Sequence, residues 1–120
     1  MSDLSNVLLI TDLDGTLLPD NKILSQKDKE AIKRFRADGG KFTVATGRTI
    51  QSAMKYFEEL EVDLPVILYN GSLIYDILTK KVMYTDFLPE CAAEIGKELF
   101  EFMENPGGEV LRLDNIYVVC

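Results

Sequence analysis

The feature that most constrains the fold is a continuous apolar run that ends at two aspartates. Residues 6–11 read NVLLIT, without the alternation of polar and apolar residues that a half-exposed strand shows. Such a run is typical of a strand that is buried on both faces of a parallel sheet. Asp12 and Asp14 follow it directly, and Gly15 permits a sharp turn away from the strand. The sequence therefore predicts an α/β protein with carboxylates at the carboxyl end of its first strand.

The next sixty residues continue the strand and helix pattern. Ser25, with Asp28 three residues later, resembles a capping box and begins a predicted helix that Gly39-Gly40 ends. The remaining expected elements are a strand over 41–46, a helix over 49–60 and a strand over 65–69. This βαβαβ order predicts a Rossmann-like parallel sheet with right-handed crossovers.

After Asn70-Gly71 the pattern changes. Residues 72–76 and 81–87 flank a short polar turn and predict a hairpin, and residues 89–103 have apolar positions at helical spacing. Two strand-like runs follow, at 109–114 and 116–120. We therefore divide the chain into a first part, residues 1–71, and a second α+β part, residues 72–120.

Composition excludes several classes of function. The formal net charge of −7 leaves no basic surface for nucleic acid, and the absence of histidine excludes Ser-His-Asp catalysis and histidine zinc sites. Cys91 and Cys120 are too few for a disulfide framework, and they are interpreted as ordinary thiols. The apolar run at the N-terminus is too short to cross a bilayer. We expect a cytoplasmic protein without a nucleic-acid or membrane partner.

Polar or glycine-containing clusters end all three predicted strands, at residues 11–16, 46–48 and 70–71. Ligands of open α/β sheets bind outside the carboxyl ends of the strands. Asp12 and Asp14 lie two apart on what we expect to be an extended segment, so that both carboxylates point to one side. Their mutual repulsion raises one pKa unless a cation intervenes, and Mg²⁺ accepts carboxylate and phosphate oxygens. The sequence thus predicts a metal-dependent phosphate site.

Two other kinds of site that use carboxylates, an EF-hand loop and a receiver domain, match the sequence less well. In an EF-hand loop that begins at Asp12, the required glycine and glutamate would fall on Leu17 and Ile23. A receiver domain of two-component signalling needs an acceptor aspartate after its third strand, where this chain has Asn70. The receiver is kept as an alternative of another class, together with a noncatalytic fragment.

Three short motifs resemble the haloacid dehalogenase superfamily, in its Cof-type branch with a type IIB cap. They are DLDGTLL at 12–18, TGR at 46–48 and NG at 70–71. The resemblance implies that Asp12 attacks phosphorus and forms an aspartyl phosphate. It implies that Asp14 protonates the leaving oxygen and then activates water. It also implies that the carboxylate of Asp12 and the backbone carbonyl of Asp14 bind Mg²⁺.

The same resemblance assigns the phosphate contacts. It implies that the Thr46 hydroxyl binds the transferring phosphoryl group, helped by the backbone N–H groups of Leu13 and Gly47. Arg48 and Asn70 match positions near the substrate and the cap hinge. Residues 1–71 would be the N-terminal part of the core and residues 72–120 part of the cap.

The implied function is a Mg²⁺-dependent phosphatase of a small phosphorylated metabolite, with a sugar phosphate as the expected substrate. A phosphomutase of the same superfamily is the nearest alternative. The resemblance covers about the first half of a typical member, without the later phosphate-binding lysine and the GDxxND-type loop. We therefore expect these 120 residues by themselves to show weak metal affinity, little phosphatase activity and self-association through an open sheet edge.

Overall fold

A computed structural model describes residues 3–113 and 115–119 of the chain. Its helices and strands agree with the expected elements to within a few residues. They are β1 (Leu8–Thr11), α1 (Gln26–Ala37), β2 (Lys41–Val44), α2 (Ile50–Glu59), β3 (Val66–Leu68), the 3-10 turn η1 (Tyr69–Gly71), β4 (Leu73–Asp76), β5 (Lys81–Thr85), α3 (Ala92–Phe102), β6 (Gly108–Leu111) and β7 (Ile116–Val119). Asp114 and Cys120, at the ends of the last two expected strands, lie outside the described residues. The chain forms two compact units, one extending to Thr85 and one beginning at Asp86.

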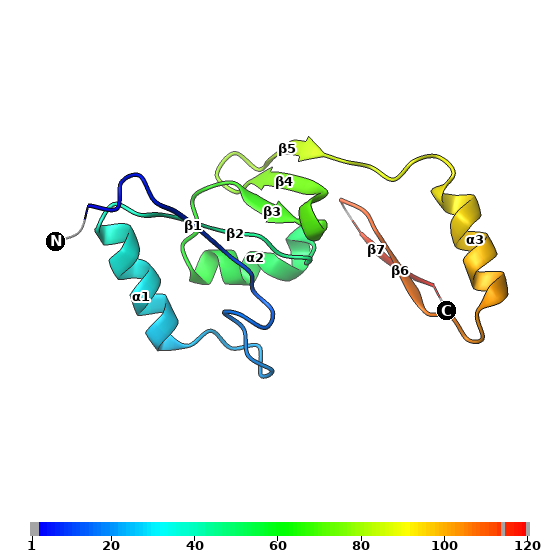
Figure 1. Cartoon of the computed structure of the whole chain (residues 1–120), viewed down its shortest axis with the longest axis horizontal. Helices are drawn as coiled ribbons and strands as arrows, with labels where there is room; N and C mark the ends of the chain where they lie inside the picture. The colour runs from blue at the N-terminus through cyan, green and yellow to red at the C-terminus, as the bar shows by residue number, and fades with distance from the viewer. Residues whose placement is uncertain (1–2, 114, 120) are drawn as a thin grey trace. The chain divides into compact units, whose positions relative to one another are not determined.

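The first crossover is parallel, as expected. β1 and β2 pair in register from Leu8 with Lys41 to Thr11 with Val44, and α1 connects them (Figure 1). Ser25 caps α1, because its hydroxyl accepts a hydrogen bond of 3.0 Å from the backbone N–H of Asp28. The carboxyl ends of the two strands therefore lie side by side.

The expected three-stranded parallel sheet is only partly formed. Just beyond the end of β2, Ala45 forms an isolated parallel bridge with Ile67 of β3, whose main partner is the antiparallel strand β4. The cause is the turn η1, where Tyr69 and Asn70 both have positive φ angles and send the chain back along β3. β4 then pairs with β5 in the expected hairpin, so β3, β4 and β5 form one sheet in the first unit.

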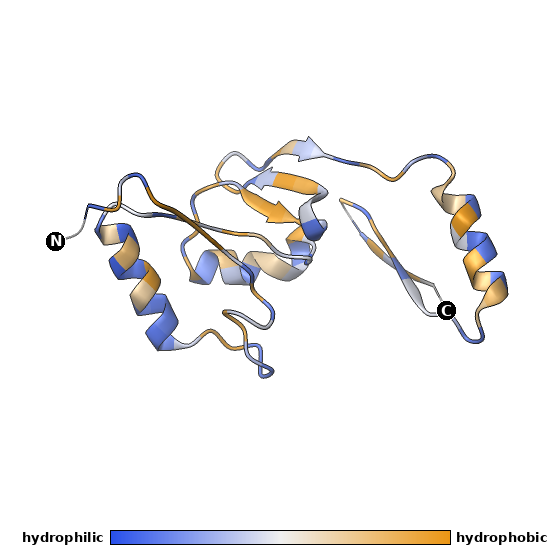
Figure 2. Ribbon diagram, in the orientation of Figure 1, coloured by the Kyte–Doolittle hydropathy of each residue, from blue (hydrophilic) through white to orange (hydrophobic). Residues whose placement is uncertain are grey.

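The core of the first unit lies around α2, β2, β3 and the loop after β1. Phe42 and Phe57 are each 1% exposed, and Leu13, Val66 and Leu68 are fully buried. Burying such a side chain contributes about 1.5–3 kcal/mol relative to leaving it exposed. Figure 2 shows the apolar stretches of β3 and β4 within this unit. The loop that carries the two aspartates is thus anchored in the core by its own leucines.

The expectation that the first strand is buried on both faces is wrong for this structure. Leu8 is 54% exposed and Ile10 is 46% exposed, while Leu9, on the other face, is 38% exposed. β2 is the only strand that pairs with β1 among the described residues, so β1 is an edge strand. An apolar run encodes a tendency to be buried, but burial itself depends on which segments pack against the strand.

The second unit has little core of its own. No side chain of α3 is buried, and Ile95, Leu99 and Phe102 are all more than half exposed. β6 and β7 form an antiparallel hairpin from the pair Gly108 and Val119 to the pair Leu111 and Ile116. In the part of the chain that the structure describes, no helix has the length and apolar character needed to span a bilayer.

Candidate active site

The three polar strand ends meet at one place in the first unit. The backbone N–H of Ala45 donates to the carbonyl of Thr11 at 2.8 Å, which brings the residues after β1 next to those after β2. Thr46 donates its N–H to Ile67 at 2.9 Å, and Asn70 donates its N–H to the Thr46 carbonyl at 3.3 Å. The structure therefore brings Asp12, Thr46 and Asn70 to adjacent strand ends, as the sequence predicts.

The loop after β1 makes a tight turn that begins at Leu13, and the extended segment from Asp12 to Asp14 stays a prediction. The carbonyl of Leu13 accepts hydrogen bonds from the N–H groups of Thr16 and Leu18, and Gly15 has a φ of +79°. Leu13 and Leu18 are at most 1% exposed and fix this turn to the core. Because this turn begins at Leu13, between the two aspartates, strand alternation alone does not decide where both carboxylates point.

The two aspartates have different partners. Asp12 is exposed, and its Oδ1 accepts a hydrogen bond of 2.7 Å from the backbone N–H of Leu13. The Leu13 N–H, which the resemblance assigns to phosphate, is therefore bonded to the Asp12 carboxylate in this structure. Asp14 is half-buried and bonds to side chains from two other segments.

Arg48 and Lys22 both bind the Asp14 carboxylate. Arg48 is bidentate, since its Nε donates to Oδ2 at 2.7 Å and its Nη2 donates to Oδ1 at 2.9 Å. The ammonium group of Lys22 donates to the same Oδ1 at 2.7 Å. Hydrogen bonds from Arg48 and then from Lys22 hold the pKa of Asp14 well below its usual range. Repulsion between neighbouring carboxylates is expected to raise one pKa unless a cation intervenes. At Asp14 two cations intervene, and its pKa is lowered.

This pairing bears on the role predicted for Asp14. A general acid must carry the proton that it transfers, and Asp14 bound to two cations is an ionised carboxylate. The geometry fits a carboxylate that orients Arg48 and Lys22, and the lowered pKa makes Asp14 a weak base as well while these partners are bound. Proton donation by Asp14 stays a prediction, and it requires Arg48 and Lys22 to take another partner.

Arg48 is held in place by the residues around it. Its Nη1 donates to the carbonyl of Ser52 at 3.3 Å, and its guanidinium carbon lies 5.1 Å from the centroid of the Tyr56 ring. Its backbone N–H donates to the hydroxyl of Thr46 at 3.2 Å. Thr46 is 5% exposed, so the hydroxyl predicted to bind phosphate is buried and contacts Arg48. Thr49 then caps α2 through a 3.2 Å bond from the N–H of Ser52.

Gly47 and Asn70 are in close contact. A Cβ atom at Gly47 would lie 2.6 Å from Oδ1 of Asn70, so any other residue there requires the exposed Asn70 side chain to move. Asn70 itself has a φ of 55°, a left-handed conformation that asparagine tolerates better than most residues. The contact joins the second and third sequence motifs directly.

Lys22 and Tyr56 are the site residues that the sequence motifs do not indicate. Lys22 lies eight residues beyond Asp14, in a loop with no recognisable spacing, and Tyr56 occupies an apolar position of an amphipathic helix. The Tyr56 hydroxyl donates to the Lys22 carbonyl at 3.2 Å across 34 residues of sequence. No local pattern could have revealed this pair, because the contact depends on the path of the chain.

The chemistry of the donor groups fits Mg²⁺ in part. Asp12 offers an exposed carboxylate and Asp14 a backbone carbonyl, and Mg²⁺ commonly binds one or two carboxylates, water and substrate phosphate. Within residues 3–113 and 115–119 no group of three or more acidic, cysteine or histidine side chains is placed to hold a metal. Thr11, next to Asp12, has the one buried side-chain oxygen among them without a hydrogen-bond partner. Asp12 and the Asp14 carbonyl would therefore hold the ion together with water and substrate.

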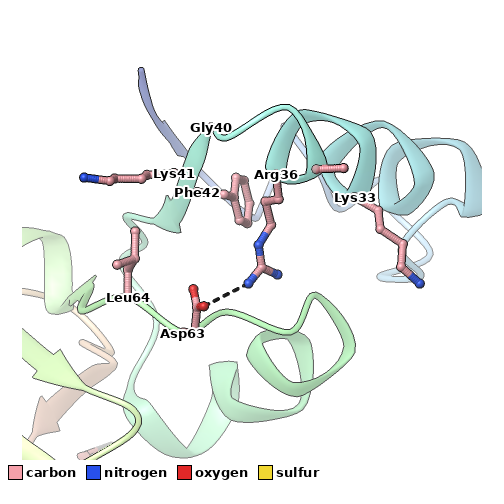
Figure 3. Close-up of a pocket in the computed structure, with 8 residues that line it drawn as sticks. Lys33, Arg36, Gly40, Lys41, Phe42, Asp63 and Leu64 are labelled. Atoms are coloured by element: carbon pink, nitrogen blue, oxygen red, sulfur yellow. Dashed lines mark ion pairs between the residues drawn. The ribbon is translucent and has the colours of Figure 1, made fainter. Parts of the chain in front are cut away.

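A separate hollow lies near the start of β2, away from these strand ends. It has a volume of about 460 Å³ and is lined by residues of α1, β2 and the segment before β3. Figure 3 shows Arg36 reaching across it to Asp63, with Lys33 and Lys41 pointing away from this ion pair of 3.1 Å. Arg36 also donates to the carbonyls of Leu60 and Glu61 beyond α2. These contacts give Arg36 a structural role between α1 and the end of α2.

The fold and the site together define an α/β protein with two aspartates and two cationic side chains near its strand ends. The family model of the haloacid dehalogenase-like hydrolases matches residues 9–118, and the chain belongs to this family. The family expected from the three motifs is thereby confirmed, and the match supports it over a receiver domain.

Three similar proteins illustrate the relationship. Pyridoxal phosphate phosphatase YbhA of Escherichia coli is 30% identical over 90% of this chain and 45% of its own length. The 5-amino-6-(5-phospho-D-ribitylamino)uracil phosphatase YitU of Bacillus subtilis is 35% identical over 57% of this chain and 25% of its own. The structure of BT1666 from Bacteroides thetaiotaomicron, described among phosphatases of the HAD superfamily, has a TM-score of 0.75, 25% identity and coverage of 93% of this chain and 41% of that one. The chain thus spans less than half the length of these relatives.

Proposed function

We propose that this chain carries the nucleophile half of a Mg²⁺-dependent phosphatase active site of the Cof-type, type IIB branch. The observation that carries the proposal is the position of Asp12, an exposed carboxylate at the carboxyl end of β1, beside the ends of β2 and β3. An exposed carboxylate on a rigid turn can approach phosphorus without rearrangement of the core. The family relationship supports the same assignment.

In this proposal each residue has a defined role. Asp12 attacks phosphorus and becomes an aspartyl phosphate, which water then hydrolyses. Asp14 serves as acid and then as base, and it exchanges its cationic partners during the cycle. Thr46 and the backbone N–H groups of Leu13 and Gly47 orient the phosphoryl group. Mg²⁺, when bound, neutralises charge on that group.

The substrate class that we propose is a small phosphorylated metabolite. Two relatives are named for phosphorylated small molecules, pyridoxal phosphate and a phosphoribitylamino uracil. A sugar phosphate is the narrower form of the proposal. We also propose a cytoplasmic location, which the low cysteine content of the chain supports.

The test is phosphate release from p-nitrophenyl phosphate with added Mg²⁺, measured in the longest natural polypeptide that contains these residues. Asp12→Asn should reduce turnover to background without changing the unfolding midpoint, since the side chain is exposed. Asp20→Asn, an exposed aspartate of the same loop, is the matched control and should keep turnover. Near wild-type turnover of Asp12→Asn would refute the nucleophile assignment.

The alternatives predict different products. A phosphomutase would pass the phosphoryl group from Asp12 back to a sugar and release little free phosphate. A noncatalytic fragment would bind metal stoichiometrically without any turnover. Trapping of labelled phosphate on the wild-type protein and its absence on Asp12→Asn would support both enzymatic readings and exclude the noncatalytic one.

A further inference from the structure

We propose that Lys22 and Arg48 form an anion seat, occupied in this structure by the Asp14 carboxylate, that receives the phosphate group of the substrate. The inference rests on the proposed function, and it adds Lys22 to the substrate-binding residues. In the bound state the phosphate oxygens take the place of the Asp14 oxygens on one or both cations. Asp14 then becomes free for another partner.

Charge is the first reason for this assignment. Lys22 and Arg48 carry two positive charges, and the Asp14 carboxylate that they share carries one negative charge. With Asp12 of the same loop, the four side chains sum to zero. The ammonium group of a third cation, Lys55, lies 4.8 Å from the centroid of the Tyr56 ring that supports Arg48. A phosphate monoester carries between one and two negative charges at pH 7, so it balances the two charges of Lys22 and Arg48 more fully than one carboxylate does. The cluster is local, since the chain as a whole carries a formal charge of −7.

Access is the second reason. The side chains of Lys22 and Asp14 are 49% and 37% exposed, so an anion from solvent can reach both without opening the core. Asp14 can be rehydrated when it is displaced, which keeps the cost of the exchange low. Arg48 is only 22% exposed, and Ser52 and Tyr56 keep its guanidinium in position during such an exchange.

The backbone of Lys22 is the third reason. Lys22 has a φ of 57°, a conformation that lysine seldom adopts and that costs about 1 kcal/mol or more. Two hydrogen bonds hold it there, from its N–H to the carbonyl of Pro19 at 2.8 Å and from the Tyr56 hydroxyl to its own carbonyl at 3.2 Å. Tyr56 is 3% exposed and belongs to the core. A strained residue tied to the core, with its exposed ammonium group on the Asp14 carboxylate, fits a substrate-binding role.

The test is a titration of the isotope-labelled chain with inorganic phosphate at constant ionic strength, followed through the amide NMR signals of Leu13, Thr46 and Lys22. Lys22→Gln should raise the dissociation constant about two- to five-fold, as expected for loss of one exposed charge pair. Lys22→Gly, which accepts the positive φ without strain, should do the same. Lys29→Gln is the matched control, because Lys29 pairs with Glu59 on the surface of α1, and it should leave the constant unchanged.

Asp14→Asn gives a second test, in which the dissociation constant for phosphate should change in the opposite direction. Removal of the internal anion should strengthen phosphate binding, whereas Asp20→Asn, with the same change of charge, should not. If phosphate shifts Leu13 and Thr46 but binds Lys22→Gln as tightly as Lys29→Gln, the anion seat is wrong and the phosphate site stands. If phosphate shifts none of these signals in the wild-type chain, the anion seat fails, and the nucleophile assignment is decided separately by the turnover of Asp12→Asn.

Discussion

Arg48 donates two hydrogen bonds, of 2.7 and 2.9 Å, to the carboxylate of Asp14, which lies 34 residues away in the sequence. This pair joins the turn after β1 to the segment between β2 and α2. It fixes the charge state of one of the two motif aspartates and leaves the other, Asp12, exposed. The effect of the Arg48–Asp14 pair on stability can be measured in the isolated chain.

The first prediction concerns acid stability. The pKa of Asp14 is lower in the folded state than in the unfolded state, so its contribution to stability is present above the usual aspartate pKa of about 3.9 and is lost as the pH falls below it. Arg48→Gln removes the main cause of the shift. Between pH 5 and pH 3 the wild-type chain should therefore lose more of its free energy of unfolding than Arg48→Gln does.

The measurement is urea unfolding at a series of pH values. Because the Asp14 side chain is partly exposed, the difference should be about 0.2–1 kcal/mol, as for surface ion pairs. Salt at 1 M should reduce it. Parallel stability curves for the two proteins would contradict the prediction.

The second prediction concerns the contact between Gly47 and Asn70. Gly47→Ala places a Cβ 2.6 Å from Oδ1 of Asn70, and because both residues are exposed the Asn70 amide can move, so the cost should stay below about 1 kcal/mol of stability. Asn70→Gly removes the obstructing side chain and accepts the positive φ at that position. The double variant should recover most of the loss, which a double-mutant cycle of unfolding free energies will show. If the two changes in unfolding free energy simply add, the contact between Gly47 and Asn70 does not couple the two positions.

The third prediction concerns the exposed strand β1. An apolar edge strand is a template for pairing with another strand, so the chain should self-associate at micromolar concentration. Ile10→Lys should shift it towards monomer in sedimentation experiments. Leu78→Lys introduces the same charge at an exposed apolar residue of the β4–β5 turn and should have no such effect. A wild-type chain that stays monomeric at these concentrations would disprove the prediction.

The fourth prediction concerns the metal. The described residues offer Mg²⁺ one exposed carboxylate and one carbonyl, so binding to the chain alone should be weak, in the millimolar range or above. Paramagnetic Mn²⁺ should broaden the amide signals of residues 12–15 first. Asp12→Asn should abolish this broadening, whereas Asp63→Asn, an exposed aspartate near the other end of the sheet, should leave it unchanged. Broadening that survives in Asp12→Asn would remove Asp12 from the ligands.

The sequence by itself determined the local elements and the family. The apolar run before Asp12, the capping residue Ser25 and the helical spacing of apolar residues each record a preference that acts within a few residues, and the elements form where expected. The convergence of polar strand ends was also predictable, because parallel strands joined by a helix must end on the same edge.

Tertiary structure alone decided the partners at the site and the exposure of β1. Lys22 reaches Asp14 because Tyr56, on a helix 34 residues away, holds its carbonyl, and a one-dimensional pattern contains no such information. β3 pairs mainly with β4 because Tyr69 and Asn70 turn the chain back, although its apolar run reads like that of a parallel strand. β1 carries the sequence of a buried strand, yet it is exposed, because burial depends on the segments that cover a strand.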